Sequence, residues 1–162
     1  MNLNETPQLF QFETASQTGM KFMPMIVRFH LDLLGLHLSF AQWQALPEGD
    51  REKLACFPII ENAQPAPEFG RALQAMLHAH TNANTNANDE VQRFAPDASP
   101  AWQNLAAVPD DVIHQARLAG VHAPGVAQWA RLTALQRYAL CKLSRKPQVH
   151  RDFTAAMREF GL

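Results

Sequence analysis

Helix-start and helix-stop residues recur at short intervals along this chain, and they constrain its fold more than any other feature. Prolines and capping residues bound segments whose apolar side chains lie three and four residues apart, which is typical of amphipathic helices. Alternation of the strand type occurs over residues 9–12, a stretch too short to establish a sheet. We therefore predict an all-α fold, a compact bundle of six to eight short helices with turns punctuated by proline.

The clearest helix is predicted from Pro24 to a stop at Gly35, because proline suits a first turn and glycine commonly ends a helix. Thr133 and Gln136 form a capping box that predicts a helix over residues 134–144. Ser99 and Pro100 predict a further helix start. The helix after this start is predicted to carry Trp102 and Leu105. Two further helices are predicted over residues 68–80 and 150–160.

A length of 162 residues fits one domain, and neither half alone has enough apolar residues for a comfortable core. Residues 81–89 form a low-complexity tract of Asn, Ala and Thr with nothing large to anchor it. We therefore expect a single helical domain over residues 1–162, with a mobile Asn-rich loop at about 81–90.

Charge is divided unevenly along the chain, although the formal net charge is only −1. Residues 1–112 carry six Lys/Arg against thirteen Asp/Glu, whereas residues 113–162 carry eight against two. Two interpretations stay open: the charges of the halves balance each other across a packed surface, or the C-terminal end offers a cationic docking site.

The first residues show no basic region followed by an apolar run and a small-residue cleavage site, and no segment is apolar over the length of a bilayer. We therefore expect a cytoplasmic protein without a membrane partner. Cys56 and Cys141 lie 85 positions apart without a CxxC pattern. In a reducing compartment both are expected to be buried thiols.

Catalytic and metal-binding patterns are missing from the sequence. His78 and His80 point to opposite sides of their predicted helix and so do not chelate one ion. The sequence lacks an HExxH motif, a GxSxG motif and glycines with phosphate-loop spacing. We therefore expect no catalytic residue, no metal and no cofactor, and a protein that is not an enzyme.

Basic residues cluster near the C-terminus, where short helices and tight turns resemble a helix-turn-helix. At the start of the 134–144 helix only Gln136 and Arg137 are candidate base readers. Cations near a helix C-terminus also interact favourably with its dipole. Binding of nucleic acid is therefore an alternative rather than the main prediction. The basic residues are Arg131, Arg137, Lys142, Arg145, Lys146 and Arg151.

Two blocks of the sequence resemble the conserved nitrate reductase-associated protein family. Residues 23–43 carry the pattern PM-V-R-LD-G, preceded by FQFE at 10–13. Residues 129–145 carry LQR-AL-KLSR, followed by the pairs at 152–153 and 159–160. The family pattern has cysteines where this chain has Phe22 and Leu34, so the resemblance implies no thiol-based metal or cluster role here.

The resemblance implies a non-catalytic accessory or maturation factor that supports assimilatory nitrate reductase, with the reductase or its maturation machinery as partner. Its alternative is a nucleic-acid-binding regulator of nitrate-assimilation genes. The direct partner and the oligomeric state stay open.

Packing does not explain five polar residues of the matching blocks. One hypothesis is that they form a polar groove for a partner protein or an anionic ligand, such as the phosphate of a molybdenum cofactor. The other is an Arg–Asp clasp that joins the two ends of the chain. Stability is a weak reason for the pair of Arg28 and Asp32, because a surface pair four residues apart on a helix stabilises it by only a few tenths of a kcal/mol. The five residues are Arg28, Asp32, Arg137, Lys142 and Arg145.

Overall fold

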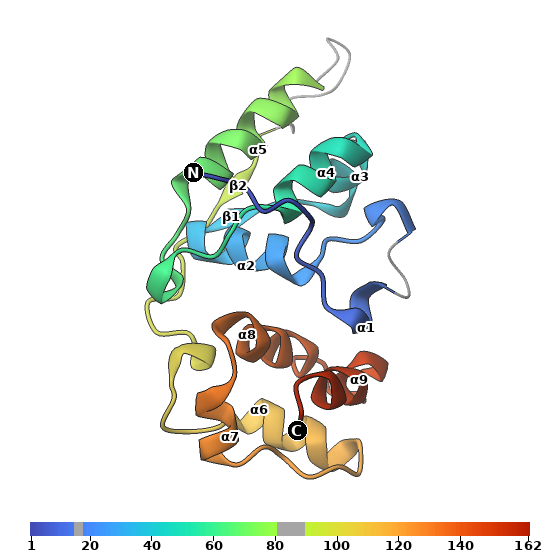
Figure 1. Cartoon of the computed structure of the whole chain (residues 1–162), viewed down its shortest axis with the longest axis vertical. Helices are drawn as coiled ribbons and strands as arrows, with labels where there is room; N and C mark the ends of the chain where they lie inside the picture. The colour runs from blue at the N-terminus through green and yellow to red at the C-terminus, as the bar shows by residue number, and fades with distance from the viewer. Residues whose placement is uncertain (15–17, 81–89) are drawn as a thin grey trace. The chain divides into compact units, whose positions relative to one another are not determined.

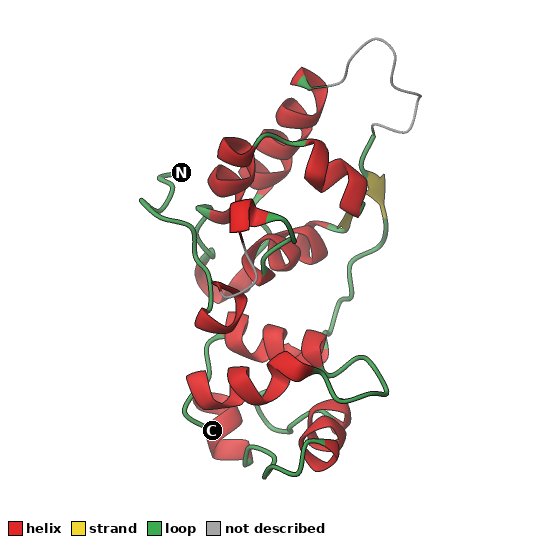
Figure 2. Ribbon diagram, turned by 90° about the vertical axis from the view of Figure 1, so that its right-hand side faces the viewer, coloured by secondary structure: helices red, strands yellow, loops and turns green. Residues whose placement is uncertain are grey.

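The computed structural model describes residues 1–14, 18–80 and 90–162. Helices dominate these residues (Figure 2), which confirms the all-α class. They form nine α-helices rather than six to eight, because the count includes the four-residue α1 (Gln11–Thr14). The mobile loop predicted at about 81–90 lies, apart from Glu90, outside the described residues.

Internal contacts divide the chain into two compact units. Unit 1 comprises residues 1–9 and 13–97, and unit 2 comprises residues 10–12 and 98–162. The single domain stays a prediction.

The described residues of unit 1 contain four complete helices and two short turns (Figure 1). Its core contains the fully buried side chains of Ile26, Phe29, Trp43, Leu54 and Phe69. Burying a side chain of this size stabilises a fold by about 1.5–3 kcal/mol. The elements are η1 (Thr18–Met20), α2 (Met25–Leu34), α3 (Phe40–Ala45), α4 (Glu48–Ala55), η2 (Glu61–Ala63) and α5 (Pro67–Ala79), where η denotes a 3₁₀ helix.

The predicted helix from Pro24 to Gly35 is confirmed as α2, and both of its ends are fixed. At the start, the buried carboxylate of Glu13 accepts a hydrogen bond from the Met25 N–H at 2.7 Å. A negative charge at a helix N-terminus interacts favourably with the helix dipole. At the end, Gly35 has φ 67° and accepts a hydrogen bond from the Phe94 N–H at 2.9 Å. This turn begins the antiparallel pair of β1 (Leu36–His37) and β2 (Gln92–Arg93).

Unit 2 is also built from four helices, preceded by the turn η3 (Ala101–Gln103) (Figure 1). The capping box of Thr133 and Gln136 is confirmed, with hydrogen bonds of 3.1 and 2.9 Å. Phe10 and Phe12 belong to this unit and pack on Phe160, so residues 9–12 lead into a helical turn rather than a strand. The helices are α6 (Asp110–Leu118), α7 (Val126–Arg131), α8 (Ala134–Leu143) and α9 (Arg151–Glu159).

The prediction of a helix after Ser99 and Pro100 was wrong, because only the three-residue η3 forms there. The Asn104 side chain accepts a hydrogen bond from the Ala106 N–H at 2.9 Å, which favours a turn over a continuing helix. Leu105 is 47% exposed instead of packed.

The two units repeat one pattern of sequence and structure, which the sequence analysis missed. Residues 39–54 and 125–140 align without a gap and share six of sixteen residues. In each unit the first helix follows a proline and leads to a glycine with positive φ, Gly35 at 67° and Gly120 at 69°. In each the fourth helix buries a phenylalanine, Phe69 or Phe153.

The repeated residues make equivalent contacts. Trp43 donates its indole N–H to the Met20 carbonyl at 2.8 Å, and Trp129 donates its own to the Asn104 carbonyl at 2.9 Å. Both indoles are fully buried and both tie the second helix of a unit to the turn that precedes its first helix. A shared sequence pattern therefore corresponds to a shared packing solution.

A buried polar side chain on the first helix of each unit completes the pattern. His30 is fully buried, stacks on Phe69 with ring centroids 4.8 Å apart, and its Nε2 donates to the Phe57 carbonyl at 3.1 Å. Gln115, fully buried on α6, donates to the carbonyls of Lys146 and Gln148, each at 2.9 Å. Each therefore ties the first helix to the segment after the third.

Changing Gly35 to alanine should destabilise the protein by about 2–3 kcal/mol, because alanine is strained at positive φ and its Cβ would lie 2.3 Å from the Phe94 carbonyl oxygen. Gly70→Ala is the matched control. Its Cβ would meet Leu34 at an ordinary 3.5 Å, and replacing a glycine inside a helix should stabilise by about 0.5–1 kcal/mol. Urea unfolding measures the change in stability of both variants, which should be a loss for Gly35→Ala and a gain for Gly70→Ala. Equal unfolding midpoints would contradict the prediction.

Protonation of His30 should destabilise the native protein. Burial lowers the pKa of its imidazole below the usual 6.5, so the unfolded chain binds the proton more readily. The free energy of unfolding should therefore fall as the pH drops below about 6.5, by up to about 1.4 kcal/mol per pH unit. His30→Phe should flatten this slope in urea unfolding between pH 5 and 7. The exposed pair of His80 and Asp50 is retained in both proteins, so equal slopes would count against His30.

Candidate functional site

Four cations gather where α8 leads into α9, and we call them the basic corner: Lys142, Arg145, Lys146 and Arg151. Arg145, Lys146 and Arg151 are exposed. Lys142 is half-buried, and its Nζ lies 5.4 Å from the ring centroid of Tyr138, a cation–π contact. Arg151 Nε lies 3.8 Å from the Asp152 carboxylate, a long ion pair. This surface presents positive charge to solvent.

The backbone of the basic corner is held by Gln115. Its amide group donates to the carbonyls of Lys146 and Gln148, and its oxygen accepts from the His150 N–H at 3.3 Å. His150 in turn caps α9, its Nδ1 accepting from the Asp152 N–H at 3.1 Å. The loop over residues 144–150 therefore has a defined path, although its cations point to solvent.

The repeated fold does not require this charge. In unit 1 the corresponding connection, residues 56–66, contains no Lys or Arg. Over their whole sequences, unit 1 has six Lys/Arg against eleven Asp/Glu and unit 2 has eight against four. The basic corner therefore distinguishes the second copy of the pattern from the first.

Arg137 is buried, whereas Lys142 is half-buried and Arg145 is exposed. Arg137 is 9% exposed, its Nε donates to the Trp102 carbonyl at 2.8 Å, and its Nη1 donates to the Leu132 carbonyl at the end of α7. Burial lowers the pKa of its guanidinium, which stays charged at neutral pH. Its repeat counterpart Arg51 likewise donates to a carbonyl, that of Met20, at 3.0 Å. We therefore assign Arg137 to the framework of unit 2.

Arg28 and Asp32 lie on α2 in unit 1, whereas the other three predicted residues lie in unit 2. Arg28 is exposed and donates to the Met23 carbonyl at 3.1 Å, and Asp32 is half-buried. The structure therefore groups Lys142 with Arg145 and leaves the groove and the clasp between the two ends of the chain as predictions.

Neither cysteine is a ready nucleophile. Both thiols are free. Burial raises the pKa of Cys56, with a further contribution from the charge of Glu52. Burial also raises the pKa of Cys141 to about 11. Because the thiolate is the reactive form, both groups are protonated and unreactive at neutral pH.

Across residues 1–14, 18–80 and 90–162, no three His, Cys, Asp or Glu side chains come together in a group that could hold a metal ion. Within the same part of the chain, no helix has the length and apolar character needed to cross a membrane.

The helix-turn-helix interpretation places α8 as the base-reading helix, and its packing disfavours that role. Leu135, Tyr138 and Leu140 are buried on it. Of the two candidate base readers, Gln136 is engaged in the capping box and Arg137 in bonds to carbonyls.

Sequence reasoning named Lys146 and Arg151 as basic residues but not as site residues, and it missed Gln115 entirely. The alignment of residues 39–54 with 125–140 was the available signal, because it separates repeated framework residues such as Arg137 from the cations that occur in one copy.

Arg137→Met should lower the free energy of unfolding by about 2–4 kcal/mol, because two buried carbonyls lose a charged donor. The matched change Arg145→Met removes the same charge from an exposed position and should alter stability by no more than about 0.5 kcal/mol. Thermal or urea unfolding compares them, and equal losses would contradict the assignment of Arg137 to the framework.

Comparisons with known proteins give one family. Searches of curated proteins and of solved structures found no match. The family model of the conserved nitrate reductase-associated protein matches residues 9–160, and its name associates the family with nitrate reductase. Because the match covers both units almost completely, this chain belongs to the conserved nitrate reductase-associated protein family.

Proposed function

We propose that this protein is a non-catalytic, cytoplasmic accessory or maturation factor for assimilatory nitrate reductase, acting by binding a partner protein or its cofactor. The observation that carries the proposal is the basic corner. Its exposed cations stand on a loop held by Gln115, and the equivalent connection of unit 1 lacks them. The family name, which associates the family with nitrate reductase, supports the choice of the reductase as the partner system.

The partner chemistry follows from the charges. A cluster of exposed cations speeds association with an acidic surface and selects against basic ones. Arginine also binds phosphate with two parallel hydrogen bonds, so a phosphate of the reductase cofactor is a ligand of the same chemistry. An acidic patch on the reductase or on its maturation machinery is the primary partner that we propose.

The test is charge reversal of the two loop cations, Arg145→Glu with Lys146→Glu, measured by binding of the purified full-length chain to nitrate reductase apoprotein at low salt. Affinity should fall at least tenfold, mainly through slower association, because the change replaces attraction by repulsion. The melting temperature should stay within a few degrees of the wild-type value, since both side chains are exposed.

The matched control reverses the same charge elsewhere in unit 2, with Arg117→Glu on α6 and Arg131→Glu on α7. Both residues are exposed. Arg131 precedes the start of α8, and the loop cations Arg145 and Lys146 follow its end, so the ten residues of α8 separate them by about 15 Å. Arg117 lies two residues after Gln115, about 200° around α6, and so on the opposite face from the side chain that contacts the loop. Control affinity should stay within about threefold of the wild type, as expected for rim charges away from a contact.

Unchanged binding in the loop variant, or an equal loss in the control, would contradict docking at the basic corner. Binding to duplex DNA would instead favour the nucleic-acid-binding regulator, under two conditions. The affinity for DNA should fall steeply between about 50 and 200 mM salt, and the loop variant should lose it.

A further inference from the structure

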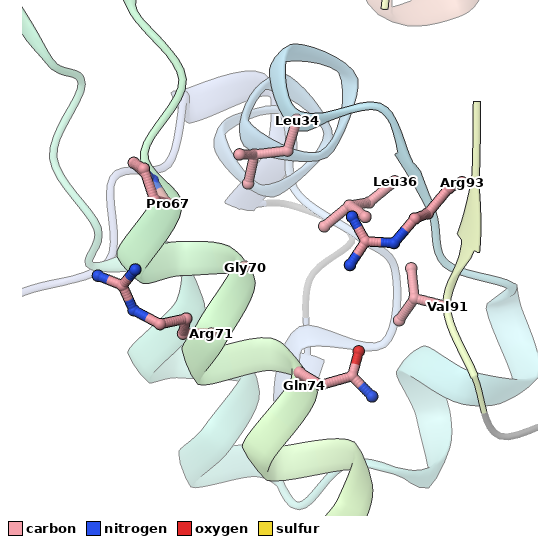
Figure 3. A pocket seen from close by; sticks show the side chains of 8 residues that line it. All are labelled: Leu34, Leu36, Pro67, Gly70, Arg71, Gln74, Val91 and Arg93. Atoms are coloured by element: carbon pink, nitrogen blue, oxygen red, sulfur yellow. The ribbon is translucent and has the colours of Figure 1, made fainter. Parts of the chain in front are cut away.

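A cavity of about 330 Å³ opens in unit 1 between α5, the end of α2 and the β1–β2 pair (Figure 3). Leu34, Leu36 and Val91 give it an apolar lining. Leu36 pairs with Arg93 across the two strands, so both side chains lie on one face of the pair. Val91 is two residues before Arg93 and shares that face. The register therefore places apolar and cationic groups beside each other in this cavity.

Gly70 creates part of the space. A Cβ at this position would meet the Leu34 Cδ1 at 3.5 Å and the Leu36 Cδ1 at 3.7 Å, which is ordinary contact. A larger side chain would extend from there into the cavity. The alignment of Phe69 with Phe153 gives Gly70 the counterpart Thr154 on α9, and the two strands found in the described residues both belong to unit 1. The cavity is therefore not a requirement of the repeated framework.

Arg93 and Gln74 supply polar groups to the cavity. Their side chains extend into the space between α5 and β2, whereas Arg71 extends away from it (Figure 3). Within the described part of the chain, neither Arg93 nor Gln74 makes a side-chain hydrogen bond or an ion pair. This holds although the sequence of unit 1 has an excess of acidic residues over basic ones. A guanidinium and an amide are thus available to a ligand beside an apolar surface.

We propose that this cavity binds a small organic anion, a short aliphatic chain that ends in a carboxylate. The chain packs against Leu34, Leu36 and the Cα of Gly70, and the carboxylate accepts hydrogen bonds from the Arg93 guanidinium and the Gln74 amide. A guanidinium fork matches the two oxygens of a carboxylate. The volume lies at the lower end of the range for small-ligand sites, which fits a short chain. The site is separate from the basic corner, and the proposal does not depend on the docking function.

The experiment titrates the full-length protein with hexanoate and follows the methyl resonances of Leu34, Leu36 and Val91 by NMR, up to about 20 mM ligand, the weak end of measurable affinity. Shifts should saturate with hexanoate. Hexylamine, with the same number of carbon atoms and the opposite charge, and acetate, without the longer chain, should produce no saturating shift.

Two variants locate the site. Arg93→Gln should weaken hexanoate binding about tenfold, because it removes a charge-assisted hydrogen bond. Lys53→Gln, which removes an exposed cation on α4, should not change it. Gly70→Leu should fill the cavity and abolish binding, whereas Ala75→Leu adds the same side chain at an exposed position of α5 and should leave binding intact.

Thermal unfolding of Gly70→Leu shows whether loss of binding comes from a filled cavity or from a disrupted fold. If Gly70→Leu is unfolded, hexanoate binding by Arg93→Gln tests the proposal instead. The proposal is overturned by the absence of a saturable shift with hexanoate, by equal binding of hexylamine, or by undiminished binding in Arg93→Gln. Loss of nitrate reductase binding in the basic corner variant would leave these results untouched, so the two proposals succeed or fail separately.

Discussion

A buried indole N–H bonded to the backbone carbonyl of a preceding turn is the interaction on which each unit depends. Trp43 and Trp129 lie on six-residue helices that are too short to be stable alone, so these helices need tertiary contacts to persist. The indole supplies a large apolar surface and a single donor, and the donor must find an acceptor when it is buried. An arginine four residues into the next helix, Arg51 or Arg137, then bonds to the same turn region. Together these contacts join the turn to the second and third helices of its unit.

The repeated framework explains which polar residues serve stability and which are available for binding. Arg137, Gln115 and His30 are buried and bonded to backbone carbonyls, so their roles are internal. Arg145, Lys146 and Arg151 are exposed, and the guanidinium of Arg93 has no hydrogen bond or ion pair among the residues that the structure describes. Unit 2 carries cations on a loop whose backbone Gln115 holds, and unit 1 has a cavity beside a strand. Both candidate sites arise where the two copies differ.

Much of the helical framework was predictable because its signals are local. Proline, glycine and capping residues act through the backbone of their own turn, and α2 and α8 begin and end close to the predicted residues. The failure at residues 99–105 has the opposite cause. The Asn104 side chain bonds to the Ala106 N–H and its carbonyl receives the indole of Trp129, a residue 25 positions away, so a distant side chain uses a group that a local helix would need. The candidate site was predictable in part: Lys142 and Arg145 stand together, while Arg137 belongs to the core.

The sequence by itself determined the helical class, the helix ends and the uneven charge, because each depends on neighbours within a few residues or on composition alone. The tertiary structure decided which polar side chains are buried, how Gln115 holds the basic loop, and where Gly70 and Arg93 enclose a cavity. These features depend on contacts between residues that are distant along the chain. Such contacts are set by the packing of whole helices, which periodicity indicates only as an apolar face and never as a specific partner.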